Sequence, residues 1–177
     1  MGKGTLCSKL AQDYGLFHFS LGDYLRSLSK DEECQVREEI VEYFRRGGLF
    51  PIEFLAPLIR EKIWKEHENG YPAIILDGFP RSAEQLYGYE NCKVYLTLYY
   101  LLKAAPDSRQ LQNFDIVVFC DCPRNILEER YLNRKLPGRV EDDKVLFDKR
   151  YAEYERLNPE VVEYFRRERM LFKVRLL

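Results

Sequence analysis

The chain has 177 residues, of which 32% are charged, and its formal net charge is −1. This size and composition suit one globular domain with its own core. A charge so close to balance excludes a protein that binds nucleic acid or an anionic membrane through its overall field, and no apolar run is long enough to span a membrane. The five scattered cysteines indicate a reducing, cytoplasmic location rather than a disulfide framework.

The first predicted element is a helix that begins at Gly2-Lys3-Gly4-Thr5. Leu6, Leu10 and Ala11 share one face of it, and Gly15 ends it. A helix start with this sequence is typical of the downstream end of a phosphate-binding loop, where backbone N–H groups and the lysine bind phosphate and the hydroxyl can ligate magnesium. The strand and upstream glycines of the full motif do not precede these residues in the sequence.

A strand is expected next at 16–20, followed directly by a helix that Asp23 is predicted to cap. Within the strand, His18 is interpreted as a packed core residue rather than as a catalyst. Two further helices are predicted from the apolar faces of residues 36–44 and 54–64, and Asn69-Gly70 ends the second.

Residues 73–77 then predict a strand that is buried on both faces of a parallel sheet, because four apolar residues stand between turn residues on either side. Ligands bind beyond the carboxyl ends of strands in such a sheet, and Asp77 and Arg81 lie at that end. A carboxylate and a guanidinium four residues apart suit a site for a cation and an anion, such as magnesium and phosphate. On these residues alone, a surface turn with unrelated charges is an equal alternative.

The remaining elements alternate between helix and strand, which predicts an α/β fold with a parallel sheet. In chain order they are a short helix with Gln85, a strand at 115–121, a helix after Pro123 with Arg130 and Arg134 on one face, a long helix with Arg150, and a strand at 171–174.

Five segments of the sequence are informative when they are taken together: GKGT, HFSLGDYLR, ILDGFPRS, FCDCP and GRVED…KR. They resemble the nucleoside monophosphate kinases, the adenylate and UMP/CMP kinase family, over almost the whole chain. The resemblance implies one domain over 1–177 of the P-loop NTPase type, with a five-stranded parallel sheet and helices on both faces. It also implies a monophosphate-binding segment at about 20–53 and a short lid at about 134–144. The family's first, central strand and its closing helix have no counterpart in the sequence, and residues 94–110 are extra.

The resemblance also implies a role for each matching residue. The catalytic cations would be Lys3, Arg81, Arg134, Arg139 and Arg150. The ATP-binding residues would be Gly2, Lys3, Gly4, Thr5 and Arg130. The monophosphate-binding residues would be Ser20, Arg26, Leu49, Phe50, Gly78, Arg81, Gln85, Arg139 and Arg150. The Mg²⁺ that accompanies ATP would be held by Asp77 through water and by Thr5.

The implied activity is phosphoryl transfer from ATP to a nucleoside monophosphate, by a monomer in the cytoplasm, with the nucleus as a second compartment. Leu21, which carries no hydroxyl, and Asp121-Cys122-Pro123 favour UMP or CMP as the acceptor, and AMP is the alternative. A further alternative is a catalytically inactive, nucleotide-binding fragment. The extra residues 94–110 are interpreted as a gene-model artefact, such as an unspliced intron, or as a genuine insertion.

Overall fold

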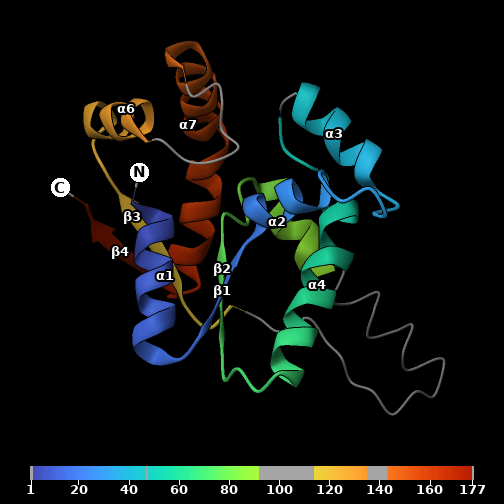
Figure 1. Ribbon diagram of the computed structural model, residues 1–177. Helices are drawn as coiled ribbons and strands as arrows, with labels where there is room; N and C mark the ends of the chain where they lie inside the picture. The colour runs from blue at the N-terminus through green and yellow to red at the C-terminus, as the bar shows by residue number, and fades with distance from the viewer. Residues whose placement is uncertain (1, 47, 92–113, 135–142, 177) are drawn as a thin grey trace. The chain divides into compact units, whose positions relative to one another are not determined.

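The computed structural model describes residues 2–46, 48–91, 114–134 and 143–176 (Figure 1). The chain forms two compact units. The N-terminal unit contains Cys7–Pro80 and Glu84–Gln112, and the C-terminal unit contains Met1–Leu6, Arg81–Ala83 and Asn113–Leu177. The predicted insertion at 94–110 and residues 135–142 of the predicted lid lie outside the described residues. The proposed subdivision of the chain into a monophosphate-binding segment and a lid therefore stays a prediction.

The N-terminal unit is built on a parallel pair of strands, β1 (Phe17–Ser20) and β2 (Ile74–Asp77). Helix α1 (Lys3–Tyr14) leads into β1 through Gly15, whose φ of +65° is a left-handed conformation that glycine adopts without strain. The register runs from Phe17 opposite Ile74 to Ser20 opposite Asp77, so both strands end at the same edge.

Three helices and one further helical segment cover this unit: α2 (Leu21–Leu28), α3 (Arg37–Arg46), α4 (Ile52–Glu68) and residues 83–91. Their apolar faces supply the core, as the helical spacing predicts. The largest fully buried side chains of this core are Ile40, Leu55, Ile59, Leu86 and Tyr89.

The predicted capping residue of α2 was wrong. The helix starts at Leu21, immediately after β1, so Ser20 is the N-cap, and its hydroxyl accepts a hydrogen bond from the Asp23 backbone N–H at 3.4 Å. Asp23 therefore lies in the first turn, where its carboxylate accepts a 2.6 Å hydrogen bond from the Ser20 hydroxyl. Two hydrogen bonds therefore join Ser20 and Asp23, and a carboxylate at this position also suits the helix dipole.

The C-terminal unit contains a second parallel pair, β3 (Val117–Asp121) and β4 (Leu171–Arg175), in register from Val117 opposite Leu171 to Asp121 opposite Arg175. Between these strands the chain forms α6 (Arg124–Asn133) and α7 (Lys144–Arg167), consistent with the long connection that parallel strands require. Asp143 caps α7 by accepting a 2.7 Å hydrogen bond from the Leu146 backbone N–H. The buried side chains of this unit include Tyr131, Phe147, Val161 and Phe165.

An α/β fold with parallel strands and helices is thus confirmed, whereas the single five-stranded sheet is not. Within the described part of the chain, the strands form two separate two-stranded sheets, β1 with β2 and β3 with β4. The family arrangement places a further strand between these pairs, and no described residue supplies it. A continuous sheet therefore stays a prediction.

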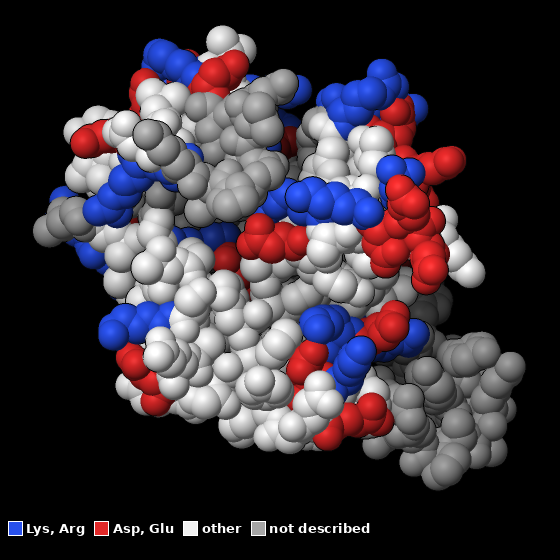
Figure 2. Space-filling model, viewed as in Figure 1, with Lys and Arg blue, Asp and Glu red and all other residues white. Residues whose placement is uncertain are grey.

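The charge distribution agrees with the balanced composition. Basic and acidic side chains are interspersed over the face shown in Figure 2. Many of them pair locally along helices, as Arg45 and Glu42 do on α3 at 2.7 Å. None of the described helices combines the length and the apolar character that a membrane span requires.

Candidate functional site

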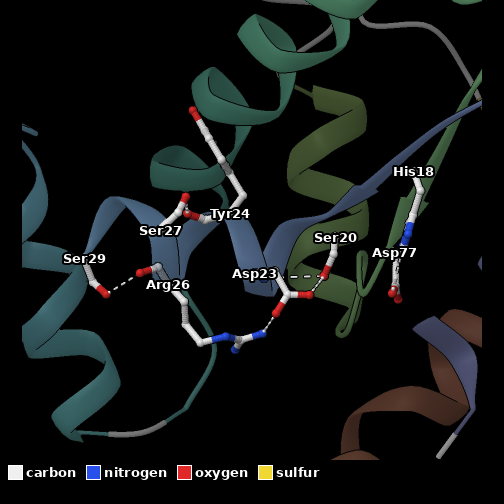
Figure 3. A network of polar contacts seen from close by, with 8 residues as sticks. All are labelled: His18, Ser20, Asp23, Tyr24, Arg26, Ser27, Ser29 and Asp77. Carbon is white, nitrogen blue, oxygen red and sulfur yellow. Dashed lines mark hydrogen bonds and ion pairs between the residues drawn. The ribbon is translucent and has the colours of Figure 1, made fainter. Parts of the chain in front are cut away.

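Asp77 lies at the carboxyl end of β2, where the sequence predicted a functional carboxylate. Its side chain is buried, and its Oδ2 atom lies 3.3 Å from Nε2 of His18 on β1 (Figure 3). The other ring nitrogen of His18, Nδ1, is 3.1 Å from the hydroxyl of Ser8 on α1. His18 therefore connects α1 to the carboxylate, and its interpretation as a mere packing residue was incomplete.

The strand register explains why His18 reaches Asp77. Ser20 is paired with Asp77, and His18 precedes Ser20 by two residues, so all three side chains lie on one face of the strand pair. The alternation of side chains along a strand, visible in the sequence, places His18 and Ser20 on one face. That this face also carries Asp77 follows only from the register.

The donor chemistry of Asp77 fits the magnesium ion that the fold family implies. Mg²⁺ takes oxygen ligands, keeps several waters, and is commonly bound through one or two carboxylates together with substrate phosphates. Asp77 offers such a carboxylate at a strand end. Thr5, the second predicted ligand, is in the first turn of α1 and belongs to the C-terminal unit, so its role stays a prediction.

Ser20 and Arg26, two predicted monophosphate-binding residues, are connected through Asp23. The Arg26 guanidinium donates to Asp23 Oδ1, and the Ser20 hydroxyl donates to Asp23 Oδ2 (Figure 3). A Cβ atom on Gly22 would lie 3.4 Å from Nη2 of Arg26, which shows that the arginine folds back over the first turn of α2. The guanidinium is thus held next to the end of β1, where the carboxyl edge of the strand pair lies.

Phe50 and Gln85, which were predicted to contact the acceptor, are in direct contact with each other. Gln85 is 4% exposed, and its side-chain amide donates a 2.9 Å hydrogen bond to the Phe50 carbonyl. The Phe50 ring stacks on Phe54, with centroids 5.5 Å apart. Leu49 is half-buried beside them. These contacts fix the segment before α4 against the helix at 83–91.

In the C-terminal unit, Tyr131 positions two of the predicted catalytic arginines. Arg150 Nη1 donates a 2.9 Å hydrogen bond to the Tyr131 hydroxyl, and the Arg134 guanidinium lies 4.1 Å from the centroid of the Tyr131 ring. Tyr131 is 1% exposed, and cation–π contacts strengthen when they are desolvated. Sequence reasoning missed Tyr131, although an aromatic residue three positions before an arginine, within a predicted helix, was a usable signal.

The prediction that Arg130 and Arg134 share one helical face was wrong. Helix α6 ends at Asn133, and Arg134 has an extended ψ of 111°, consistent with the tendency of helices to end shortly before a proline, here Pro137. Arg130 Nη1 instead lies 4.0 Å from the Cys122 sulfur.

Gly2 and Arg130, two predicted ATP-binding residues, come close together. A Cβ atom on Gly2 would lie 3.8 Å from Arg130 Nη1, and Gly2 has a φ of +84°. Lys3, Gly4 and Thr5 then form the first turn of α1. Gly78, with a φ of +88°, turns the chain directly after β2, and Arg139 lies outside the described residues. The convergence of these groups on one site with Asp77 stays a prediction.

Comparison with known proteins identifies the family. The family model described as adenylate kinase matches residues 1–170. The chain therefore belongs to the adenylate kinase family and is a nucleoside monophosphate kinase family enzyme.

Among curated relatives, the uridylate kinase of Saccharomyces cerevisiae is 30% identical over 175 residues, covering 98% of this chain and 77% of the relative. UMP-CMP kinase 2 of Oryza sativa subsp. japonica is 33% identical over 165 residues, covering 93% of this chain and 58% of the relative. The UMP-CMP kinase of Sus scrofa is 28% identical over 170 residues, covering 93% of this chain and 78% of the relative.

Proposed function

We propose that this protein transfers the terminal phosphoryl group of ATP to UMP or CMP, giving ADP and UDP or CDP. The observation that carries the proposal is the family match over residues 1–170 together with a buried Asp77 at the end of β2, followed by Gly78-Phe79-Pro80-Arg81. The activity belongs to pyrimidine nucleotide synthesis. The proposed location is the cytoplasm, with the nucleus as a second compartment, and the proposed working form is the monomer.

Phosphoryl transfer requires positioned cations more than it requires a nucleophile or a strong base, because negative charge spreads over the oxygens of the transferring group. Lys3, Arg81, Arg134, Arg139 and Arg150 are proposed to supply these cations. Mg²⁺ bound with ATP would neutralise charge on the phosphates, and Asp77 would orient it through water. Tyr131 would act as a positioning residue, because its hydroxyl and ring hold Arg150 and Arg134.

The Gly2–Thr5 turn and Arg130 are proposed to bind ATP. Ser20, Arg26, Leu49, Phe50, Gly78 and Gln85, together with Arg81, Arg139 and Arg150, are proposed to bind the monophosphate. Movement of segments 20–53 and 134–144 over the substrates would exclude water, which would otherwise accept the phosphoryl group.

The preference for a pyrimidine acceptor rests on two features. Leu21 is buried at the start of α2 and offers no hydroxyl to a base, and the relatives named above carry the names uridylate kinase and UMP-CMP kinase. AMP is the second candidate acceptor, because the Gln85 amide can pair with the edge of adenine as well as with that of a pyrimidine.

The test is a coupled assay with ATP·Mg and, separately, UMP, CMP and AMP. We expect turnover with UMP or CMP to exceed turnover with AMP. A preference for AMP would instead identify the activity as that of an adenylate kinase. The absence of turnover with every acceptor would refute the proposed activity and favour an inactive nucleotide-binding chain.

The matched control is the substitution of a second arginine, away from the proposed site. Arg81→Ala is expected to abolish activity, whereas Arg166→Ala, which removes an exposed arginine paired with Glu163 at the end of α7, is expected to leave activity unchanged. Both variants should give the circular dichroism spectrum of the unmodified protein. Unfolding of Arg81→Ala would contradict the assignment of Arg81 to the site.

A further inference from the structure

Three metal-ligating side chains come together in the N-terminal unit. A sulfur from Cys7 on α1, a ring nitrogen from His18 on β1 and a carboxylate oxygen from Asp77 on β2 all lie within 4.8 Å of one another. Asp77 is buried and the other two residues are half-buried. The proposed phosphoryl transfer uses only Asp77, so the sulfur and the imidazole need another explanation.

The distances are close to those of a tetrahedral metal site. Two nitrogen or oxygen ligands at about 2.1 Å from a tetrahedral zinc ion lie about 3.4 Å apart, and His18 Nε2 is already 3.3 Å from Asp77 Oδ2. The sulfur, at most 4.8 Å from its partners, would need to approach by roughly 1 Å to reach the spacing set by a Zn–S bond of about 2.3 Å. Rotation of one half-buried cysteine side chain can supply a movement of that size.

The surroundings of His18 suit ligation through Nε2. Ligating histidines usually engage their second ring nitrogen in a hydrogen bond, which fixes the tautomer and the orientation of the ring. Here Nδ1 lies 3.1 Å from the Ser8 hydroxyl. With a metal bound, Ser8 can therefore accept the Nδ1–H bond while Nε2 directs its lone pair at the metal ion.

We propose that Cys7 Sγ, His18 Nε2 and an Asp77 carboxylate oxygen bind a thiophilic divalent cation of the Zn²⁺ class. Water completes the fourth position, as in zinc sites with three protein ligands. On binding, the Cys7 thiol loses its proton to solvent and the thiolate forms the metal–sulfur bond. Sulfur and imidazole ligands favour zinc and its neighbours over Mg²⁺, which prefers oxygen.

One consequence rests on the proposed function. If Asp77 organises Mg²⁺ during phosphoryl transfer, a Zn²⁺ ion bound to the same carboxylate inhibits the reaction. The binding itself does not depend on that function, so it is tested without nucleotide and without an activity measurement.

The first experiment adds Co²⁺, a spectroscopic substitute for Zn²⁺, to the reduced full chain. We expect a thiolate-to-cobalt charge-transfer band that Zn²⁺ displaces, that is lost in Cys7→Ser, and that needs at least tenfold more Co²⁺ in His18→Gln. Ser8→Ala should weaken binding about tenfold, the usual effect of removing a group that orients a ligand.

The chain supplies matched controls. His67 is the other of its two histidines and packs beside Trp64 on α4, so His67→Gln should leave the cobalt band unchanged, as should Cys34→Ser. A band that persists in Cys7→Ser but disappears in Cys122→Ser would place the metal at the residue that follows β3 and overturn the proposal. The absence of any thiolate–cobalt band in the unmodified protein would also overturn it.

A second measurement uses the unmodified protein and so does not depend on any variant folding. Alkylation by iodoacetamide is followed at each cysteine by mass spectrometry, with and without Zn²⁺. Zn²⁺ should slow the alkylation of Cys7 at least tenfold and leave that of Cys34 unchanged. An unchanged rate at Cys7 would refute the site.

Discussion

Gly88 allows the helix at 83–91 to approach α4 closely, and its replacement by alanine should destabilise the protein. A Cβ atom on Gly88 would lie 2.3 Å from Ile52 Cγ2 and 3.1 Å from both Ile52 Cβ and Cγ1. Ile52 is 2% exposed and lies in the first turn of α4. Because the nearest atoms are attached directly to the β-carbon of a branched side chain, rotation of Ile52 cannot remove the contact.

The expected magnitude follows from two opposing effects. Overpacking of a dense core costs about 1–3 kcal/mol, while replacing glycine by alanine within a helix contributes up to about 1 kcal/mol of stabilisation. With the full offset, we therefore expect Gly88→Ala to lower the free energy of unfolding by up to about 2 kcal/mol, measured by urea denaturation followed by circular dichroism.

Gly22→Ala is the matched control, because Gly22 is also helical and its Cβ would meet only the guanidinium end of Arg26, at 3.4 Å. This variant should be as stable as the unmodified protein or slightly more stable. Ile52→Ala removes the obstructing atoms, so Gly88→Ala should be less destabilising in that background, by about 1–2 kcal/mol. Equal effects of Gly88→Ala in both backgrounds would refute the packing argument.

The same substitution tests the acceptor assignment. The close approach at Gly88 holds the Gln85 amide 2.9 Å from the Phe50 carbonyl. If these residues bind the monophosphate, Gly88→Ala should raise KM for the acceptor more than KM for ATP. A larger rise for ATP would contradict the proposed role of Gln85 and Phe50.

Three further predictions address the arginines, the buried tyrosine and the start of α2. Tyr131→Phe removes the acceptor of the Arg150 hydrogen bond but keeps the ring beneath Arg134. We expect kcat to fall several-fold while the circular dichroism spectrum stays unchanged. An unchanged kcat would exclude a positioning role for Tyr131. Burial raises the pKa of Tyr89 to about 12 from a usual value near 10. The contribution of the buried, neutral tyrosine to stability is therefore complete below pH 10 and is lost as the pH rises toward 12. Over that range, the free energy of unfolding should fall less steeply in Tyr89→Phe than in the unmodified protein. Ser20→Ala removes the N-cap of α2 and should cost about 1 kcal/mol by urea denaturation, whereas retention of full stability would show that Asp23 stabilises the helix without it.

Local sequence patterns predicted most elements of the fold. Apolar runs between turn residues located β2 and β3, and helical spacing followed by glycine located α1 and α4, because these signals depend on neighbours in the chain. The cap of α2 was misassigned because Ser20 and Asp23 are both suitable caps, and the choice depends on where β1 ends.

The site was harder to predict because its contacts join distant segments. His18 meets Asp77, 59 residues away, only because the register pairs Ser20 with Asp77, and nothing local in either segment specifies that register. The contact between Gln85 and Phe50 likewise depends on the close approach at Gly88. The motif order selected candidate residues, whose roles stay predictions, and it carried no information on which side chains hold them.

The two groups of arginines are held in chemically different ways, and this difference bears on how phosphate could be bound. Arg26 pairs with the carboxylate of Asp23, an anion that competes directly with an incoming phosphate for the same guanidinium. Arg134 and Arg150 contact the neutral ring and hydroxyl of Tyr131, and these contacts orient both cations. Preorganised cations that need no rearrangement contribute most where charge develops in a transition state. Orientation by Tyr131 therefore suits the role proposed for Arg134 and Arg150 at the transferring phosphoryl group. The Arg26–Asp23 pair, in contrast, adds an exchange of partners to the proposed binding and release of a monophosphate.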